Sequence, residues 1–227
     1  MARLRKAAKM WRRPEARSAA HRALVAGDGN LFAIDPRAIF GNAAPLEIEL
    51  GAGKGDFIVP RAQEFPHRNF LAVELSGVVS RMLAVRCGRA ALKNLRVVRM
   101  DARTLVNLML EPESVDAYHI YFPDPWPKER HHKHRLFTPS LVTSLRRTLR
   151  NDGMLFVATD VGEYAQQIFA MLDVRGLTPS PEAVPGSDQT GFGRRFAATG
   201  KTVYARAYRK IVADAAINDR RIAVRPT

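Results

Sequence analysis

From residue 45 onward, short apolar runs alternate with segments of helical length, and no other feature of the chain constrains its fold as strongly. A strand, a helix and a second strand in succession place the two strands parallel, with the helix on one face of the sheet. The pattern therefore predicts a parallel sheet covered by helices on both faces. The expected strands are 46–50, 69–75, 95–100, 115–122 and 153–160. The expected helices are 55–65, 76–92, 103–110, 138–150 and 162–176.

The last expected element, residues 201–211, reads KTVYARAYRKI and alternates apolar with polar side chains. Such alternation is typical of a strand with one face in water. Many otherwise parallel sheets carry an antiparallel strand of this kind at one edge. We therefore expect an α/β fold with a doubly wound, mostly parallel sheet and an antiparallel C-terminal edge strand.

The charge of the chain indicates a polyanionic partner. Lys and Arg number 36 against 22 Asp and Glu, which gives a formal net charge of +14. The basic stretches are scattered along the chain, which suits a folded nucleic acid better than a membrane surface. No apolar run approaches the length of a membrane span. The single cysteine, Cys87, excludes an internal disulfide framework and fits a cytoplasmic location.

The chain is expected to have two parts. Residues 1–24 carry eight Lys or Arg and one acid, Glu15, which is typical of a basic arm. An Arg-rich, acid-poor start also resembles an organellar transit peptide, but we favour the arm. We expect an N-terminal arm over residues 1–44 and one domain over residues 45–227.

Glycines and acids follow the first two expected strands, at the sheet edge where open α/β sheets bind ligands. Gly51 and Gly53 allow a tight turn and the close approach of a ligand to the backbone. Glu74 can accept hydrogen bonds from both hydroxyls of a ribose. A glycine-rich connector with an exposed acid remains the alternative.

The same segment narrows the class of ribose ligand. Asp56 stands where the dinucleotide fingerprint G-x-G-x-x-G requires a small residue, and no Walker lysine follows the glycines. Glu49, two residues before Gly51, would repel a pyrophosphate. It suits a ligand with cationic groups, such as the ammonium and sulfonium of S-adenosylmethionine.

Two further acids end expected strands, and each has two interpretations. Asp101 could accept a hydrogen bond from an adenine amino group, or it could cap the helix 103–110. Asp160 could face the substrate, or it could form a capping box with Glu163.

Residues 122–127 read FPDPWP, and their three prolines predict a stiff, extended segment that holds Asp124 at the rim of the site. The segment 128–135, KERHHKHR, could meet several phosphates through Lys128 and the other cations. Its histidines lack the i, i+4 spacing of a helical metal site and no cysteine lies nearby, so we expect no metal. A proline-rich turn before a solvated charged loop remains the alternative.

The stretch FPDPWPKERHHKHRL resembles the signature of bacterial tRNA (guanine-N7)-methyltransferases, F-P-D-P-W-x-K-x-R-H-x-K-R-R, with His134 where Arg is usual. The resemblance covers roughly residues 45–210, and ATD at 158–160 fits it too. It implies a class I S-adenosylmethionine-dependent methyltransferase with a seven-stranded Rossmann-like sheet. It also implies that the substrate is tRNA, methylated at guanosine 46 of the variable loop.

The resemblance also implies roles for particular residues. The residues expected to hold S-adenosylmethionine are Glu49, Gly51, Gly53, Glu74, Asp101 and Asp124. Asp124 would also be the catalytic residue at the reaction centre, while Lys128 and Asp160 would contact the substrate nucleoside.

The family's late motif T-x-F/Y-E, which touches the substrate, is matched by Thr190, Gly191, Phe192 and Gly193. Glycine at position 193 replaces the family's glutamate. Glu182 or Asp188 could supply the missing carboxylate, or the alignment of the motif slips at this point.

The chemistry of guanine agrees with the absence of an evident general base. N7 carries a lone pair and no proton, so it can attack a sulfonium methyl directly. The alternatives are a catalytically impaired tRNA-binding protein of the same fold, favoured by Gly193, and a nucleotide-dependent oxidoreductase, disfavoured by Asp56. The sequence leaves open whether the protein is a monomer or a homodimer.

Overall fold

The computed structural model describes residues 35–211. Residues 1–34 and 212–227, which include most of the predicted basic arm, lie outside the described residues. Seven strands form a single sheet within residues 35–211. They are β1 (Leu46–Leu50), β2 (Asn69–Val73), β3 (Leu95–Val98), β4 (Val115–Tyr121), β5 (Leu149–Thr159), β6 (Leu177–Ser180) and β7 (Tyr204–Lys210).

Helices occupy most of the connections between these strands. The α-helices are α3 (Pro36–Phe40), α4 (Ile58–Glu64), α5 (Gly77–Arg89), α6 (Ala102–Thr104), α7 (Pro139–Thr148), α8 (Gly162–Asp173) and α9 (Gly191–Thr199). A π-helix, η1 (Leu105–Met109), continues α6, and two 3₁₀ helices are η2 (Glu129–His134) and η3 (Ser187–Gln189). Among the described residues no helix is both long and apolar enough to cross a lipid bilayer.

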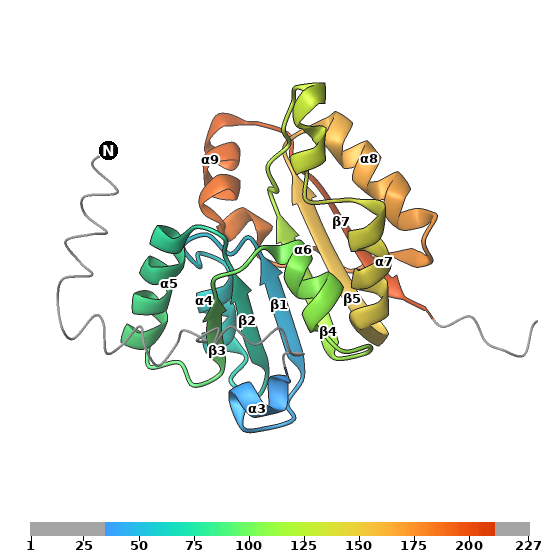
Figure 1. Ribbon diagram of the computed structural model, residues 1–227. Coiled ribbons are helices and arrows are strands. Elements are labelled where there is room, and N and C mark those ends of the chain that lie inside the picture. The colour runs from blue at the N-terminus through green and yellow to red at the C-terminus, as the bar shows by residue number, and fades with distance from the viewer. Residues whose placement is uncertain (1–34, 212–227) are drawn as a thin grey trace, which may run out of the picture.

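The strand order β3-β2-β1-β4-β5-β7-β6 confirms the predicted doubly wound, mostly parallel sheet (Figure 1). Strands β1 to β5 pair in parallel, and β7 runs antiparallel to β5 as expected. The final strand is nevertheless not at the edge, because β6 pairs with its outer side. The sequence of β6, LTPS, is short and contains a proline, so it carries little strand signal.

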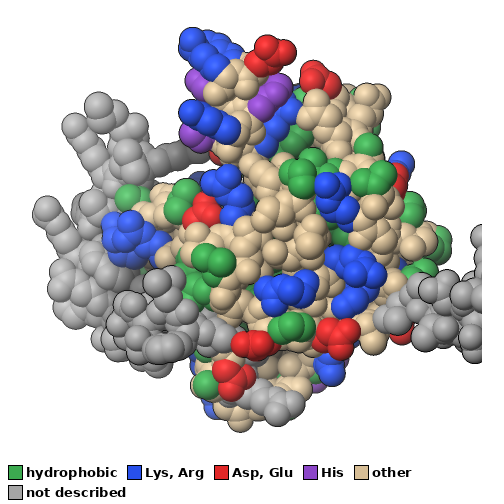
Figure 2. Space-filling view, turned by 45° about the vertical axis from the view of Figure 1, so that its right-hand side comes forward, with side chains coloured by type: hydrophobic (Ala, Val, Ile, Leu, Met, Phe, Trp, Pro, Cys, Tyr) green, Lys and Arg blue, Asp and Glu red, His purple; other side chains and the backbone are tan. Residues whose placement is uncertain are grey.

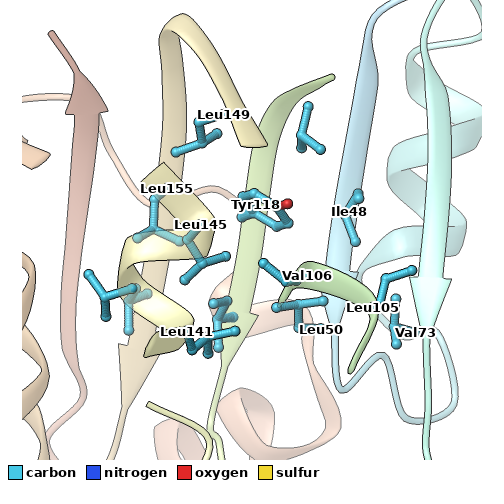
Figure 3. Packing of buried hydrophobic residues seen from close by; sticks show 14 of the residues in the cluster. Ile48, Leu50, Val73, Leu105, Val106, Tyr118, Leu141, Leu145, Leu149 and Leu155 are labelled. Atoms are coloured by element: carbon cyan, nitrogen blue, oxygen red, sulfur yellow. The ribbon is translucent and has the colours of Figure 1, made fainter. Parts of the chain in front are cut away.

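Each face of the sheet packs against its own set of helices (Figure 1). The core shown in Figure 3 lies between one face and η1, α7 and α8; it includes Ile48, Leu50, Leu105, Val106, Leu141 and Leu145. On the other face α4 and α5 cover a second core, which includes Phe57, Phe70, Ala72 and Leu83. Strands β1 and β2 are buried at every residue, as expected of parallel strands covered on both faces.

Local chemistry explains where several helices begin. Ser76 and Thr138 cap α5 and α7 by accepting hydrogen bonds from the backbone N–H groups of Val79 and Leu141. The predicted helix 55–65 begins only at Ile58, and the predicted helix 103–110 is half π-helical. The sequence did not predict α9, whose nine residues include two glycines that weaken helix formation.

Candidate active site

A pocket of about 590 Å³ opens at the carboxyl ends of the strands. It lies near the point where the chain, after building β1, β2 and β3 to one side, crosses to place β4 on the other side of β1. Open α/β sheets bind ligands at such a switch point. The lining residues come from the turn after β1, the ends of β2 and β4, helix α5 and the start of α9.

The glycine-rich turn after β1 forms one wall of this pocket. The backbone N–H groups of Gly51 and Ala52 both donate to the Val73 carbonyl oxygen at 2.9 Å, which ties the turn to the end of β2. Gly55 has φ +74°, and a Cβ there would lie 2.2 Å from a Leu83 methyl carbon. The turn therefore depends on glycine for its shape, and it brings bare backbone to the ligand.

Glu49 is the most unusual group in the pocket. Its side chain is 4% exposed, and its Oε2 has no hydrogen-bond partner among the described residues. Burial, with Asp56 and Glu74 nearby, raises the pKa of Glu49 well above its usual range, although the Ile58 N–H group opposes the shift. A buried carboxylate oxygen without a hydrogen-bond partner is costly, and a cationic ligand would relieve that cost. The site thus fits the ammonium group of S-adenosylmethionine.

Glu74 lies across the glycine turn and is held in place by the backbone. Its two carboxylate oxygens accept hydrogen bonds from Gly53 N–H at 3.0 Å and from Ser76 N–H at 2.7 Å. Each oxygen keeps a second lone pair for a ligand hydroxyl. Glu74 thus lies just after β2 in the pocket wall, and its contact with a ribose stays a prediction.

The pocket brings together five of the predicted site residues and leaves five outside its lining. Inside are Glu49, Gly51, Gly53, Glu74 and Thr190. Outside are Asp101, Asp124, Lys128, Asp160 and Gly193. Asp101 does cap α6, since its carboxylate accepts hydrogen bonds from Arg103 N–H and Thr104 N–H.

The FPDPWP segment is bent rather than extended throughout. Phe122 and Trp126 have φ +52° and +41°, in the left-handed region that residues other than glycine rarely adopt. Between these two bends Asp124 is exposed. Arg135 secures the segment by donating from Nε to the Pro125 carbonyl oxygen at 2.8 Å.

The basic segment after it projects beyond the carboxyl ends of the strands, and Lys, Arg and His side chains gather there (Figures 1 and 2). Lys128, Arg130 and Lys133 are exposed, as expected of phosphate contacts. Arg135 is not: its side chain is buried, with its guanidinium over the Tyr164 ring. Our expectation that this arginine meets phosphate was therefore wrong.

Asp160 is tied to the connection between α9 and β7. Its carboxylate forms an ion pair with the Lys201 ammonium, which also lies 4.8 Å from the centroid of the Phe196 ring. The alternative of a capping box was wrong, because Val161 is the N-cap of α8 and makes no side-chain cap. A guanine bound to Asp160 would compete with this ammonium for the carboxylate.

Thr190 is the N-cap of α9 and lines the pocket, and Gly193 lies in the first turn of that helix. Thr190 Oγ1 accepts from Gly193 N–H at 2.8 Å and donates to the Ser187 carbonyl oxygen at 2.9 Å. Gly193 is buried against η3, where an added Cβ would lie 2.1 Å from that same Ser187 oxygen. Glycine is thus the residue that this backbone requires.

Sequence reasoning missed the charges and rings that α9 brings to the pocket. Arg194 and Arg86 both pair with Asp56, at 3.1 and 2.7 Å, so one acid joins the start of α9 to α5. The Phe192 and Phe122 rings, which both line the pocket, lie 6.2 Å apart between centroids. Only the Thr190 motif hinted that residues so late in the chain reach this site.

Comparison with solved structures defines the class of fold. The chain superposes on the 16S rRNA methyltransferase KamB with a TM-score of 0.57 over 77% of this chain and 94% of that chain, at 16% sequence identity. The chain therefore has the fold of class I methyltransferases.

Sequence comparison gives the family. A family model described as "Putative methyltransferase" matches residues 43–205. The chain is 38% identical to a tRNA (guanine-N(7)-)-methyltransferase of Leifsonia xyli, over 81% of this chain and 83% of that protein. A protein of the same name from Syntrophotalea carbinolica is also 38% identical, over 75% and 76%. The chain belongs to the tRNA (guanine-N(7)-)-methyltransferase family. It is therefore an enzyme that uses S-adenosylmethionine, as the sequence predicted.

Proposed function

We propose that this chain methylates N7 of a guanosine in tRNA, at position 46 of the variable loop, and works in the cytoplasm. The relatives named for this reaction support the substrate, and the exposed cations of residues 128–134 support an RNA partner. The observation that carries the proposal is the unpartnered Glu49 oxygen in a pocket walled by the glycine turn. This combination suits a ligand that has a cationic group at one end and a nucleoside at the other.

The residues divide the task of holding the two reactants. Glu49 would bind the ammonium of S-adenosylmethionine, Glu74 its ribose, and the turn at Gly51 and Gly53 would lie against it. Asp101 would reach the adenine while it caps α6. When bound, the cofactor supplies an electrophilic methyl group to a guanine N7 that has no proton to lose.

The protein's own contribution is alignment and charge. Holding two reactants in line can remove about 7–11 kcal/mol of barrier in favourable cases, so no general base is required. Asp124, fixed between the two backbone bends, would stabilise the positive charge that develops on the imidazole ring. The target base must first leave its stack.

The substrate nucleoside would be held from two sides. Asp160 would accept from guanine N1–H and the N2 amino group in place of Lys201, and Lys128 would donate to O6. On the opposite side Thr190 and the backbone at Gly193 would contact the base. Asp124, Lys128, Asp160 and Gly193, which lie outside the pocket lining, would thus belong to the RNA side of the site.

The test is transfer of labelled methyl groups to unmodified tRNA by the wild type, Glu49→Gln and Asp124→Ala. Glu49→Gln should raise the dissociation constant of S-adenosylmethionine about tenfold to a hundredfold, as expected when a buried charge pair is lost. Asp124→Ala should abolish transfer and leave tRNA affinity nearly unchanged. Glu64→Gln, the same substitution as Glu49→Gln at an exposed site on α4, is the control.

A second candidate function is tRNA binding without transfer, which the glycine at position 193 favours. Tight binding of tRNA with no labelled product from the wild-type protein would establish it and refute the proposed reaction.

A further inference from the structure

A buried chain of polar contacts begins in β1 on the face covered by α4. Glu47 is 1% exposed, and its carboxylate accepts hydrogen bonds from Arg61 Nε at 2.5 Å and from Arg68 Nη1 at 3.1 Å. Its Oε2 also lies 2.8 Å from Nε2 of His119, in the adjacent strand β4. The two arginines thus fix the carboxylate, which in turn fixes one side of the imidazole ring.

The second ring nitrogen of His119 continues the chain of hydrogen bonds along β4 toward the pocket. Nδ1 of His119 is hydrogen-bonded to the hydroxyl of Tyr121 at 2.9 Å. The Phe57 ring lies against both, at 4.7 Å from the His119 centroid and 5.0 Å from that of Tyr121. His119 also stacks on Phe156, with the ring centroids 5.1 Å apart. These contacts pack the Tyr121 ring against Phe57 and tie its hydroxyl to His119.

The Tyr121 hydroxyl donates to the carbonyl oxygen of Pro185 at 2.8 Å. Pro185 lies in the connection from β6 to α9, and Gly186, with φ +59°, follows it. The Gly186 carbonyl accepts from Gln189 N–H at 3.0 Å and so closes the turn η3. The next residue, Thr190, lines the pocket, as Tyr121 does.

We propose that Tyr121 is a positioning residue whose hydroxyl, held by His119 and Glu47, sets the place of η3, Thr190 and the start of α9 at the pocket. The inference rests on the proposed function, since it concerns how that site is kept in shape. Within the described residues the Pro185 carbonyl accepts no other hydrogen bond, so losing the hydroxyl removes its one partner among them. When only the hydroxyl is removed, the ring of residue 121 stays packed against Phe57. The effect of the hydroxyl can therefore be measured apart from the contribution of the ring to the core.

The test compares Tyr121→Phe with Tyr118→Phe. Both residues lie in β4, and each hydroxyl makes a buried hydrogen bond; that of Tyr118 joins Thr148 Oγ1 at 2.7 Å in the core on the other face of the sheet. Two properties are measured: kcat and KM for methyl transfer to tRNA, and hydrogen exchange of the Gln189 and Gly193 amides. These amides report the turn and the cap of α9.

Tyr121→Phe should lower kcat/KM for tRNA about tenfold to a hundredfold, the scale of a site misplaced by about 1 Å. It should also speed exchange at both amides. Tyr118→Phe should keep kcat/KM within about twofold and leave both amides protected, whatever it does to the melting temperature. Wild-type kcat/KM and exchange in Tyr121→Phe, or equal losses in the two variants, would overturn the proposal.

Gly186→Ala provides a second route to the same segment without touching His119 or Glu47. A Cβ there would lie 2.7 Å from a Phe57 ring carbon, on a backbone with φ +59°. Gly186→Ala should reproduce the kinetic and exchange pattern expected of Tyr121→Phe. If Tyr121→Phe does not fold, the result for Gly186→Ala decides whether the proposal holds. If the wild-type protein transfers no methyl group to tRNA, the proposed function fails, while the exchange data still test the inference.

Discussion

Gly193 and Ser187 lie so close that no side chain fits between them: a Cβ at position 193 would be 2.1 Å from the Ser187 carbonyl oxygen. The turn η3 therefore fills the space that a glutamate at this position would need. Of the two acids that could supply the missing carboxylate, Glu182 is ion-paired with Arg209 on β7. Asp188, exposed in η3 itself, is the better candidate.

Gly193→Ala should displace η3 and destabilise the protein by about 1–3 kcal/mol, the usual cost of overpacking. Transfer to tRNA should fall with it, because the Thr190 cap is disturbed. Gly193→Glu, which introduces the residue usual in the family, should not raise activity. The measurements are thermal unfolding and kcat/KM. Gly191→Ala, whose Cβ would meet only Asp56 Oδ2 at 3.2 Å, should cost much less stability.

The affinity for S-adenosylmethionine should fall as the pH is lowered. The pKa of Glu49 is raised in the free protein, and a cation binds the ionised form. Below that raised pKa the carboxyl is protonated, so binding must release a proton and is weakened. Calorimetric titration across the pH range should show this dependence in the wild type. If Glu49→Gln shows the same dependence, another group is responsible.

Lys133 and Arg135 are neighbours in the basic segment, yet they should behave differently. Lys133 is exposed, so Lys133→Ala should weaken tRNA binding and reduce the salt slope by about 1, with little change in stability. Arg135 is buried and bonded to Pro125, so Arg135→Ala should cost about 2–3 kcal/mol of folding free energy. The checks are salt-dependent binding and denaturant unfolding. A stable Arg135→Ala protein with weakened RNA binding would contradict this assignment.

Glu47 should contribute to acid unfolding. Burial alone would raise its pKa, but His119 and Arg61 together lower it to about 2 from 4.5. Because the folded pKa is depressed, the stabilisation is present above pH 4.5 and is lost as the pH falls toward 2. The shift corresponds to about 3 kcal/mol. Unfolding free energies measured over this range should show the loss in the wild type but not in Glu47→Gln.

The sequence predicted the elements whose signal is local and strong. The five parallel strands and the acids that follow them are encoded by apolar runs bounded by glycine and charge, so Glu49 and Glu74 could be placed from the sequence alone. The family signature singled out Asp124 and Lys128, which lie outside the pocket lining, so their roles stay predictions. Each of these features is encoded within a short, continuous stretch of the chain.

What the sequence did not predict depends on contacts between distant segments. Helix α9 contains two glycines, and it is joined to the pocket wall by the pairing of Arg194 with Asp56, 138 residues away in the chain. The burial of Arg135 depends on Tyr164 and Gln167 in α8. The Tyr121 hydroxyl finds its partner 64 residues later. No periodicity encodes such pairings.

The most direct measurement is the position of the methyl group that the wild-type protein adds to unmodified tRNA. Chemical cleavage at N7-methylguanosine should locate it at one guanosine of the variable loop, and replacing that guanosine by adenosine should abolish labelling. Labelling at a different atom or nucleotide, or no labelling while the protein binds both S-adenosylmethionine and tRNA, would contradict the account.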